Sequence, residues 1–458
     1  MLNENPKTAG AGFQSIGGVL KNQGLGGRDQ GLGGGRRFGM ATAIATAALT
    51  SLWLRQSHRI QQMFSERTNW RLARNRFTEA VEEARAAGVQ LLDLTASNPT
   101  RVGLSYDSGA ILGALAAPQA LDYDPQAKGL VAAREAVAAY YRDDHGCAVD
   151  AERMVPTTST SEGYSFVFRL LCNAGDELLV PKPSYPLFEY LADLQDVKLV
   201  PYPLIYDHGW QMDFHSLERA VTGRTRGVVV VHPNNPTGSY VSEQERGLLN
   251  LFCRERGLTV VVDEVFLDYG LSASGAEAGS RKPESFAANR EVLTFTLSGL
   301  SKIAGLPQMK VAWVVTSGPR EEVAEAMARL EVIADTYLSM NAPMQWALPA
   351  LMEQRHDIQR QLRERVGANL AELDRQLAGQ KSCSRLAVEG GWYAVVRVPV
   401  TRSDEELVVA LVREKRVMVH PGHFYDFESD GYLVVSLIGD EGEFMKGVEA
   451  ILDLPNWH

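Results

Sequence analysis

The segment Thr294 to Trp313, T-F-T-L-S-G-L-S-K-I-A-G-L-P-Q-M-K-V-A-W, sets the architecture that we expect for the whole chain. A short apolar, β-prone run at Leu293 to Leu297 is followed by small residues around Lys302, and then by a second such run at Val311 to Thr316. A lysine between two buried strands is partly desolvated, which lowers its pKa and leaves a neutral, nucleophilic amine near pH 7. Such a lysine forms Schiff bases with aldehydes. For a lone lysine, a solvated loop would be the simpler interpretation.

Two further motifs precede this segment. The run H-P-N-N-P-T-G at 232–238 follows an apolar run at 227–231, and D-E-V-F at 263–266 follows another at 258–262. In this order and spacing, the three motifs resemble those of the fold-type I pyridoxal-phosphate enzymes, specifically the aspartate-aminotransferase-like class I/II aminotransferase superfamily. The resemblance extends over roughly residues 64 to 455. It implies pyridoxal 5'-phosphate as the cofactor.

The remaining pattern predicts an α/β fold. Short apolar strands alternate with helical segments such as Glu243 to Arg256, which is typical of a large domain whose mostly parallel sheet is covered by helices on both faces. Beyond residue 319, helical spacing dominates at Ala324 to Ile333 and at Met344 to Leu377, which we expect to be one long helix. Short strands follow, so we expect a smaller α/β domain from the N-terminal segment and the C-terminal third. The predicted boundaries are 63–105 for the first part of the small domain, 106–334 for the large cofactor-binding domain, and 335–458 for the rest of the small domain.

Residues 1–62 differ from this pattern. Positions 1–39 are rich in Gly, Asn, Gln and basic residues and have few large hydrophobic side chains, so they cannot bury enough surface to fold. Arg36 and Arg37 precede the weakly apolar run Met40 to Leu54, which also fits a secretory signal but is short for a transmembrane helix. We favour a disordered extension or a start codon assigned too early, with Met63 as the natural start.

Composition limits the partners and the compartment. The formal net charge of −10 argues against nucleic acid or an anionic membrane as the main partner. The four cysteines are scattered, with neither a CxxC pair nor metal-ligand spacing. We therefore expect no metal site and a reducing, cytoplasmic environment.

The resemblance assigns a role to several loop residues around the cofactor ring. Lys302 would carry the cofactor and move the proton, and Asp263 would keep the pyridine nitrogen protonated. Tyr185, in the P-x-Y-P loop after a predicted strand, would stack on the ring, and Asn235 would donate to the phenolic oxygen. A buried Asp263 could instead cap a helix. Asn235 is also a natural turn residue, a role compatible with the first.

A second group is expected to hold the cofactor phosphate. Ser159 and Glu162 have capping-box spacing, so a helix should start here, and helix N-termini bind phosphate through their free N–H groups. Tyr123 resembles the tyrosine that reaches the phosphate of the neighbouring subunit, although it could equally pack its own turn. The expected phosphate-side residues are Ser159, Thr160, Ser161, Lys310 and Tyr123, and Ser301 is expected among the other cofactor-binding residues.

Four positions depart from the family pattern. Phe266 replaces a tyrosine that donates to the phenolic oxygen, and Lys310 replaces an arginine that grips the phosphate. Ser97 replaces a glycine in the turn that faces the substrate carboxylate. Val434 stands where an arginine of an R-x-S triplet pairs with the α-carboxylate.

An unpaired carboxylate in a closed site is costly, so a replacement for that arginine is needed. We expect the turn at Ser97 and Asn98 to face the substrate and Arg101, on the same loop, to take part. Arg397 is the weaker candidate.

The sequence therefore predicts a homodimeric aminotransferase that moves an amino group between an amino donor, expected to be an amino acid, and a 2-oxo acid. A pyridoxal-phosphate-dependent lyase or decarboxylase is the alternative, because the early chemistry is shared. A cofactor-sensing regulator is a third possibility, but residues 1–62 are too rich in glycine to form the DNA-binding module that such a regulator carries.

Overall fold

The structure is a computed structural model that describes residues 63–70, 73–271, 284–338 and 340–454. The expected N-terminal extension at 1–62, including the apolar run from residue 40 to residue 54, lies outside the described residues. Among the helices of the described ranges, none has both the length and the apolar character needed to cross a membrane.

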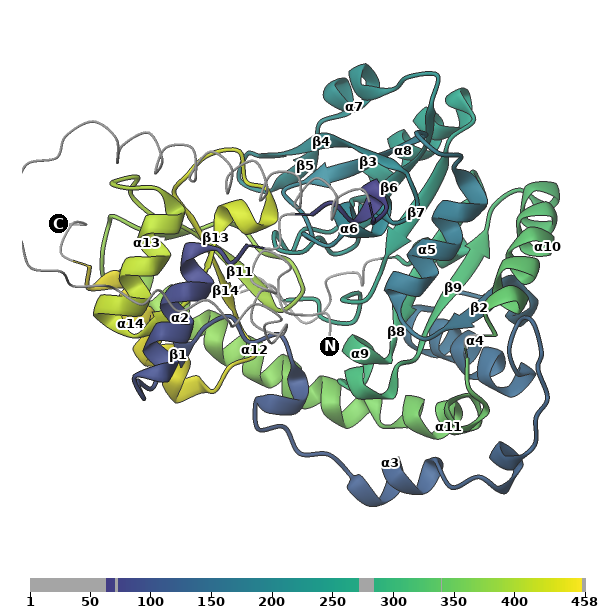
Figure 1. The fold of residues 1–458 in the computed structure, drawn as a ribbon, viewed down its shortest axis with the longest axis horizontal. Coiled ribbons are helices and arrows are strands. Elements are labelled where there is room, and N and C mark those ends of the chain that lie inside the picture. Colours follow the sequence, from purple (N-terminus) through teal and green to yellow (C-terminus); the bar gives the residue numbers. More distant parts are fainter. Residues whose placement is uncertain (1–62, 71–72, 272–283, 339, 455–458) are drawn as a thin grey trace, which may run out of the picture.

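An eight-stranded sheet forms the centre of the large part of the molecule (Figure 1). Its order is β2-β9-β8-β7-β6-β3-β4-β5. The run from β8 to β4 is parallel, whereas β9 and β5 are antiparallel to their neighbours. The sheet is therefore mostly parallel, as predicted. The strands are β2 (Met154–Thr157), β3 (Glu177–Lys182), β4 (Lys198–Tyr206), β5 (Trp210–Met212), β6 (Thr225–Val231), β7 (Thr259–Asp263), β8 (Thr294–Gly299) and β9 (Ala312–Ser317).

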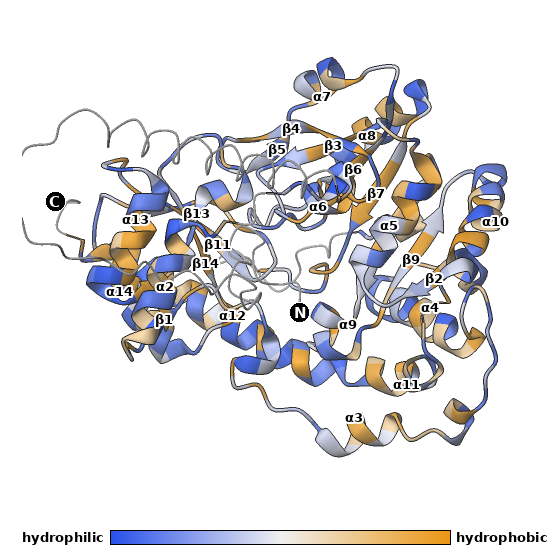
Figure 2. Cartoon of the chain, viewed as in Figure 1, coloured by the Kyte–Doolittle hydropathy of each residue, from blue (hydrophilic) through white to orange (hydrophobic). Residues whose placement is uncertain are grey.

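Helices cover both faces of this sheet, which confirms the predicted fold class. Val229 and Val261 pack with α5 (Thr160–Leu171), α6 (Phe188–Asp193) and α10 (Arg320–Tyr337) on one face. The alternate residues Val228 and Val260 pack with α7 (Phe214–Ala220) and α8 (Glu243–Arg256) on the other. On the same face as Val228 and Val260, α4 (Val131–His145) and α11 (Ala342–Glu353) cover Trp313 of β9. Because both faces are buried, the middle of β7, Val260 to Val262, is apolar, and Figure 2 shows this strand mainly in the hydrophobic colours.

The smaller part is built around a four-stranded antiparallel sheet in the order β10-β11-β14-β13. The N-terminal segment joins it, because Leu92 pairs in parallel with Val417, and Phe77 and Leu94 enter its hydrophobic core. This confirms the predicted smaller α/β unit, while the domain boundaries stay predictions. Its elements are α2 (Arg76–Ala86), β1 (Leu92–Asp93), α12 (Arg355–Ala378), β10 (Ser384–Arg385), β11 (Tyr393–Arg397), α13 (Asp404–Ala410), β12 (Val417–Met418), β13 (His420–Pro421), β14 (Tyr432–Ser436) and α14 (Glu441–Leu452).

The expected single helix from Met344 to Leu377 is wrong. The chain forms two helices, α11 and α12, which meet at Gln354. At the break, Arg355 donates to the carbonyl of Met352 at 2.8 Å and pairs with Asp144 of α4 at 2.7 Å. A carbonyl at the end of a helix has no partner within that helix, so this contact satisfies it and stabilises the break.

Candidate active site

The carboxyl ends of several strands of the large sheet meet at one place. Asp263, the last residue of β7, lies between Val231 of β6 and Leu297 of β8. Gly299, the last residue of β8, lies opposite Ala312, which in turn lies opposite Thr157 of β2. Loops beyond these ends therefore converge, and the motif residues lie on them.

Lys302 is held in α9 (Leu300–Ile303), directly after β8. A glycine is needed before this helix, because a Cβ on Gly299 would lie 2.8 Å from the carbonyl oxygen of Val311. The Leu300 N–H donates to that same carbonyl at 3.0 Å, and the Tyr269 hydroxyl donates to the Lys302 carbonyl at 2.6 Å. The turn that carries the lysine is thus fixed from two sides.

The side chain of Lys302 lies in a largely aromatic pocket. The residue is 7% exposed, and its Nζ lies 4.7 Å from the ring centroid of Trp392 and 5.3 Å from that of Phe266. Nζ also donates to the Ser97 carbonyl at 3.5 Å. Burial lowers the pKa of Lys302 to about 7, against the opposing effect of the Asp263 charge. A neutral amine is therefore accessible near pH 7, as the sequence predicts.

Asp263 is buried at the same end of the sheet. Its carboxylate accepts a hydrogen bond from the Val265 N–H at 3.1 Å and from the Tyr164 hydroxyl at 3.2 Å. Burial raises its pKa to about 6, while these two donors and the charge of Lys302 act to lower it. Tyr164 was not identified from the sequence. Its place in the sequence could have indicated a role at the site, because Tyr164 lies one turn into the helix that starts at the expected phosphate site.

Of the two expected ring contacts, Tyr185 lies within electrostatic range of Asp263. Asn235 is half-buried, and its Oδ1 is enclosed without a hydrogen-bond partner among the described residues. Tyr185 packs edge-on against Phe188, with ring centroids 5.9 Å apart. Burial, and then the charge of Asp263, raise the pKa of Tyr185 well above its ordinary value. A tyrosine beside a buried carboxylate fits a polar aromatic ring.

The expected phosphate helix is α5. Its N-cap is Ser159, whose Oγ accepts from the Glu162 N–H at 3.2 Å. The predicted capping box is only half formed, because the Glu162 carboxylate accepts from the Thr158 N–H at 2.7 Å instead of from Ser159. The hydroxyls of Thr160 and Ser161 have no hydrogen bond to a described residue.

Lys310 and Ser301 lie at the same end of the sheet. Lys310 is exposed, in a left-handed conformation with φ 54°, two residues before Ala312. Because Ala312 pairs with Thr157, the register brings this lysine near the start of α5. Ser301 lies in α9, directly before Lys302.

Other expected residues are not brought into the site within this chain. Tyr123 is 82% exposed, so it makes no buried contact inside its own subunit. Asn98 is exposed, and its side chain caps the short helix η3 (Pro99–Arg101) by accepting from the Thr100 N–H at 3.0 Å. Arg101, at the end of η3, is exposed; its backbone N–H donates to the Asn98 carbonyl at 3.1 Å, but its guanidinium has neither a hydrogen bond nor an ion pair with any described residue.

The structure also shows where Val434 and Arg397 lie, the two strand residues that bear on carboxylate binding. Val434 is fully buried in β14, so it cannot bind a carboxylate. Arg397 is exposed at the far end of β11 from Tyr393, the residue that packs against Phe266. Four residues of strand separate these positions by roughly 13 Å.

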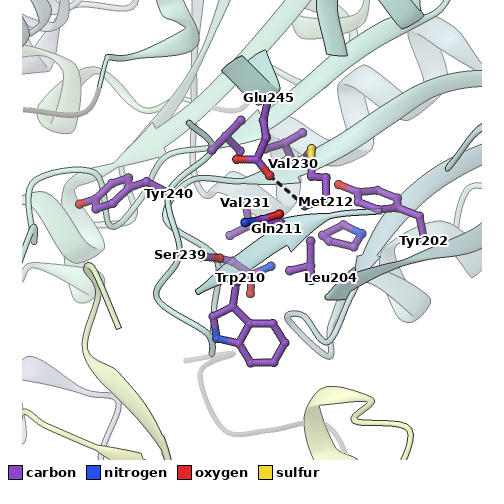
Figure 3. Close-up of a pocket in the computed structure, with 13 residues that line it drawn as sticks. Tyr202, Leu204, Trp210, Gln211, Met212, Val230, Val231, Ser239, Tyr240 and Glu245 are labelled. Carbon is purple, nitrogen blue, oxygen red and sulfur yellow. Dashed lines mark hydrogen bonds between the residues drawn. The ribbon is translucent and has the colours of Figure 1, made fainter. Parts of the chain in front are cut away.

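A separate hollow of about 290 Å³ lies beside β4, β5 and β6 (Figure 3). Trp210, Met212 and Tyr240 line it, and Glu245 accepts a hydrogen bond from the Met212 N–H at 2.8 Å at its edge. Neither Lys302 nor Asp263 lines it, so it is distinct from the strand-end site.

The residues at the strand ends fit pyridoxal phosphate. They supply an amine of lowered pKa, a buried carboxylate, an asparagine side chain whose amide N–H groups are donors, and a helix N-terminus that carries two hydroxyls. These match in turn an aldehyde, a ring nitrogen, a phenolic oxygen and a phosphate group.

Comparisons with known proteins identify the family of the chain. The model of the family "Aminotransferase class I and II" matches residues 107–451. A glutamate-pyruvate aminotransferase of Haemophilus influenzae is 27% identical over 363 residues, which cover 76% of this chain and 87% of that protein. An alanine aminotransferase of Mycobacterium tuberculosis is 27% identical over 363 residues and covers 76% of this chain and 81% of that protein.

The solved structures show the same fold. An alanine aminotransferase from Pyrococcus furiosus superposes with a TM-score of 0.74 at 20% identity, covering 84% of this chain and 98% of that chain. A single mutant of the Thermus thermophilus aspartate aminotransferase superposes with a TM-score of 0.72 at 21% identity, covering 84% and 98%. The motifs, the fold and the family match agree, and the chain belongs to the class I and II aminotransferases, a family that uses pyridoxal phosphate.

Proposed function

We propose that this aminotransferase binds pyridoxal phosphate at Lys302 and transfers an amino group from an amino acid to a 2-oxo acid. The observation that carries the proposal is the buried amine of Lys302, whose pKa is lowered to about 7, at the strand ends that also hold Asp263. The named activities of the relatives, glutamate-pyruvate and alanine aminotransferase, support small amino acids such as alanine and glutamate as donors.

Each residue has a defined task in this proposal. When bound, pyridoxal phosphate supplies an aldehyde and a ring that accepts electrons. Lys302 would hold the cofactor aldehyde through its amine and would move a proton to and from the substrate Cα. Asp263 holds a proton on the ring nitrogen, Tyr185 covers one ring face, and Asn235 donates to the phenolic oxygen. Ser159, Thr160, Ser161, Ser301 and Lys310 bind the phosphate.

The alternative of a lyase or decarboxylase has no support from the relatives, which are named as aminotransferases. A screen of amino donors tests the choice. Incubation of the holoenzyme with L-alanine or L-glutamate alone should convert the cofactor to its amine form with release of one equivalent of 2-oxo acid. Release of carbon dioxide or ammonia, with no change in cofactor form, would contradict the proposal.

We also propose that the enzyme works as a homodimer in the cytoplasm. Tyr123 and Leu121 are 82% and 92% exposed, which fits residues that contact a second subunit. The four cysteines are free in the structure, as expected in a reducing compartment.

Arg101→Ala should raise the KM for amino-acid donors about two- to fivefold and spare simple amines. The expected effect is modest, because an exposed ion pair contributes about 0.2–1 kcal/mol. Steady-state kinetics with L-alanine and with ethylamine measure it, ideally at low and high salt, since salt screens an exposed charge. An equal loss for both donors, or no loss for either, would remove Arg101 from the site.

Phe266→Tyr should lower the pH at which the bound cofactor loses its proton. The added hydroxyl can donate to the anionic phenolic oxygen, and a hydrogen bond to a charged group contributes about 1.5–3 kcal/mol, or about one to two pH units. A spectral titration of the holoenzyme gives this pH. Phe266→Leu, which adds no donor, is the control and should not lower it. No change or a rise in the tyrosine variant would contradict the expected placement of residue 266.

A further inference from the structure

The face of the small sheet that carries Val434 is turned toward the active site. Directly opposed residues of antiparallel strands share a face, and His420 of β13 lies opposite Val434. Ser436 lies two residues further along β14, on that same face. Its Oγ donates to the Ala96 carbonyl at 2.5 Å, beside the loop that contacts Lys302. His420 is therefore the polar residue next to the position of the missing arginine.

His420 is buried but keeps one nitrogen free. The residue is 8% exposed, and its Nδ1 lies 3.0 Å from the Tyr425 hydroxyl. Its Nε2 has no hydrogen bond to any residue in the described ranges. Burial lowers the pKa of His420 to about 4, so the ring is neutral at pH 7. When the Tyr425 hydroxyl donates to Nδ1, Nε2 carries the single ring hydrogen and acts as a donor.

Contacts around Tyr425 connect this histidine to the candidate active site. The Tyr425 carbonyl accepts from the Ser184 N–H at 3.0 Å, next to the expected ring-stacking residue. The Tyr425 ring lies 6.5 Å from that of Tyr393, which lies 6.3 Å from that of Phe266, the ring under the Lys302 amine. The Tyr393 hydroxyl also has no hydrogen-bond partner in the part of the chain that the structure describes.

We propose that His420 replaces the missing arginine as a specificity-determining residue: its Nε2–H donates to the α-carboxylate of the substrate, and the Tyr393 hydroxyl is the second donor. The proposal rests on the amino-acid substrates proposed above. Arg101 is exposed at the loop surface and acts on the approaching substrate, whereas His420 acts on the buried carboxylate. Two neutral donors bind a carboxylate less strongly than a bidentate arginine does, so discrimination against amines is expected to be weaker than in relatives with the arginine.

Two probes that differ in a carboxylate isolate this contact. Aminooxyacetate and O-methylhydroxylamine both react with the bound cofactor, and only the first has a carboxylate. The reaction does not require transamination, and cofactor absorbance follows it at increasing probe concentration. The wild-type holoenzyme should bind aminooxyacetate at lower concentration. His420→Leu should weaken this apparent affinity about ten- to a hundredfold, and O-methylhydroxylamine should be unaffected.

His420→Gln keeps an N–H near the position of Nε2 and should restore most of the preference for aminooxyacetate. His423→Leu is the matched control, because His423 lies three residues after His420, in the short helix η9 (Gly422–Tyr425) that follows β13, with its ring 4.9 Å from that of Phe424. It should leave the preference unchanged.

The assignment of His420 would be wrong if the wild-type enzyme showed no preference for aminooxyacetate over O-methylhydroxylamine. It would also be wrong if His420→Leu weakened the apparent affinity for both probes equally or for neither. A His420→Gln variant that behaves like His420→Leu, or a His423→Leu variant that loses as much affinity as His420→Leu, would likewise contradict it. If the probes behave as expected but no amino acid is transaminated, the proposed donor class is wrong and the carboxylate contact stands.

Discussion

Lys302→Ala should abolish covalent attachment of the cofactor and reduce transamination on the order of 10³-fold or more, because one side chain provides both the nucleophile and the proton carrier. The phosphate contacts at α5 should still hold some cofactor. Borohydride reduction followed by peptide mapping locates the attachment in the wild-type enzyme, and kcat of the variant measures the loss. A label on another lysine would contradict the assignment.

Lys310→Ala is the matched control for the mapping. It removes a second lysine at the same end of the sheet but should leave the borohydride label on Lys302 while weakening cofactor binding. The pH dependence is a second check. Attachment of cofactor to the cofactor-free protein should accelerate as the pH rises through about 7, because the neutral form of the Lys302 amine is the reactive one and its pKa is lowered to about 7.

Asp263→Asn should lower turnover at least about a hundredfold and change cofactor affinity far less. Asparagine keeps the shape of the side chain but removes the negative charge that keeps the ring nitrogen protonated, and loss of such electrostatic stabilisation typically costs 10²–10³ in rate. Half-reaction kinetics with L-alanine give the turnover, and equilibrium dialysis gives the affinity. A variant with near-native turnover would show that another group protonates the ring.

Tyr164→Phe provides the comparison for this prediction. It removes the 3.2 Å hydrogen bond to the Asp263 carboxylate but keeps the carboxylate itself. The expected loss is therefore much smaller than that of Asp263→Asn. Equal losses in the two variants would mean that the position of the carboxylate, rather than its charge, limits the rate.

Local signals predicted much of the fold. The helix at Glu243–Arg256 has the bounds expected from the sequence, because Ser242 and Glu245 form a capping box and Gly257 ends the helix with φ 62°. The strands around Lys302 were equally clear, since the apolar, β-prone runs Leu293 to Leu297 and Val311 to Thr316 overlap β8 and β9, which are buried along their whole length. In each case, the information lies within a few residues of the element.

The features that the sequence did not reveal depend on distant partners. The break between α11 and α12 is stabilised by Asp144, which lies 211 positions away from Arg355. The position of His420 beside Val434 follows from strand register, and its burial follows from the packing of the whole small sheet. Hydrophobic periodicity carries neither kind of information.

The proposed reactive residues and the proposed substrate-facing loop are attached to different sheets. Lys302, Asp263 and the start of α5 lie at the ends of strands of the large sheet. The loop before Arg101 is tied instead to the small sheet, because the Ser436 N–H donates to the Leu94 carbonyl at 2.8 Å. Substitutions in the small sheet can therefore change which substrate is accepted while the reactive amine and its proton partners keep their positions. Loss of an arginine at residue 434 during evolution would therefore change which amino donors are accepted and would leave Lys302 and Asp263 in place.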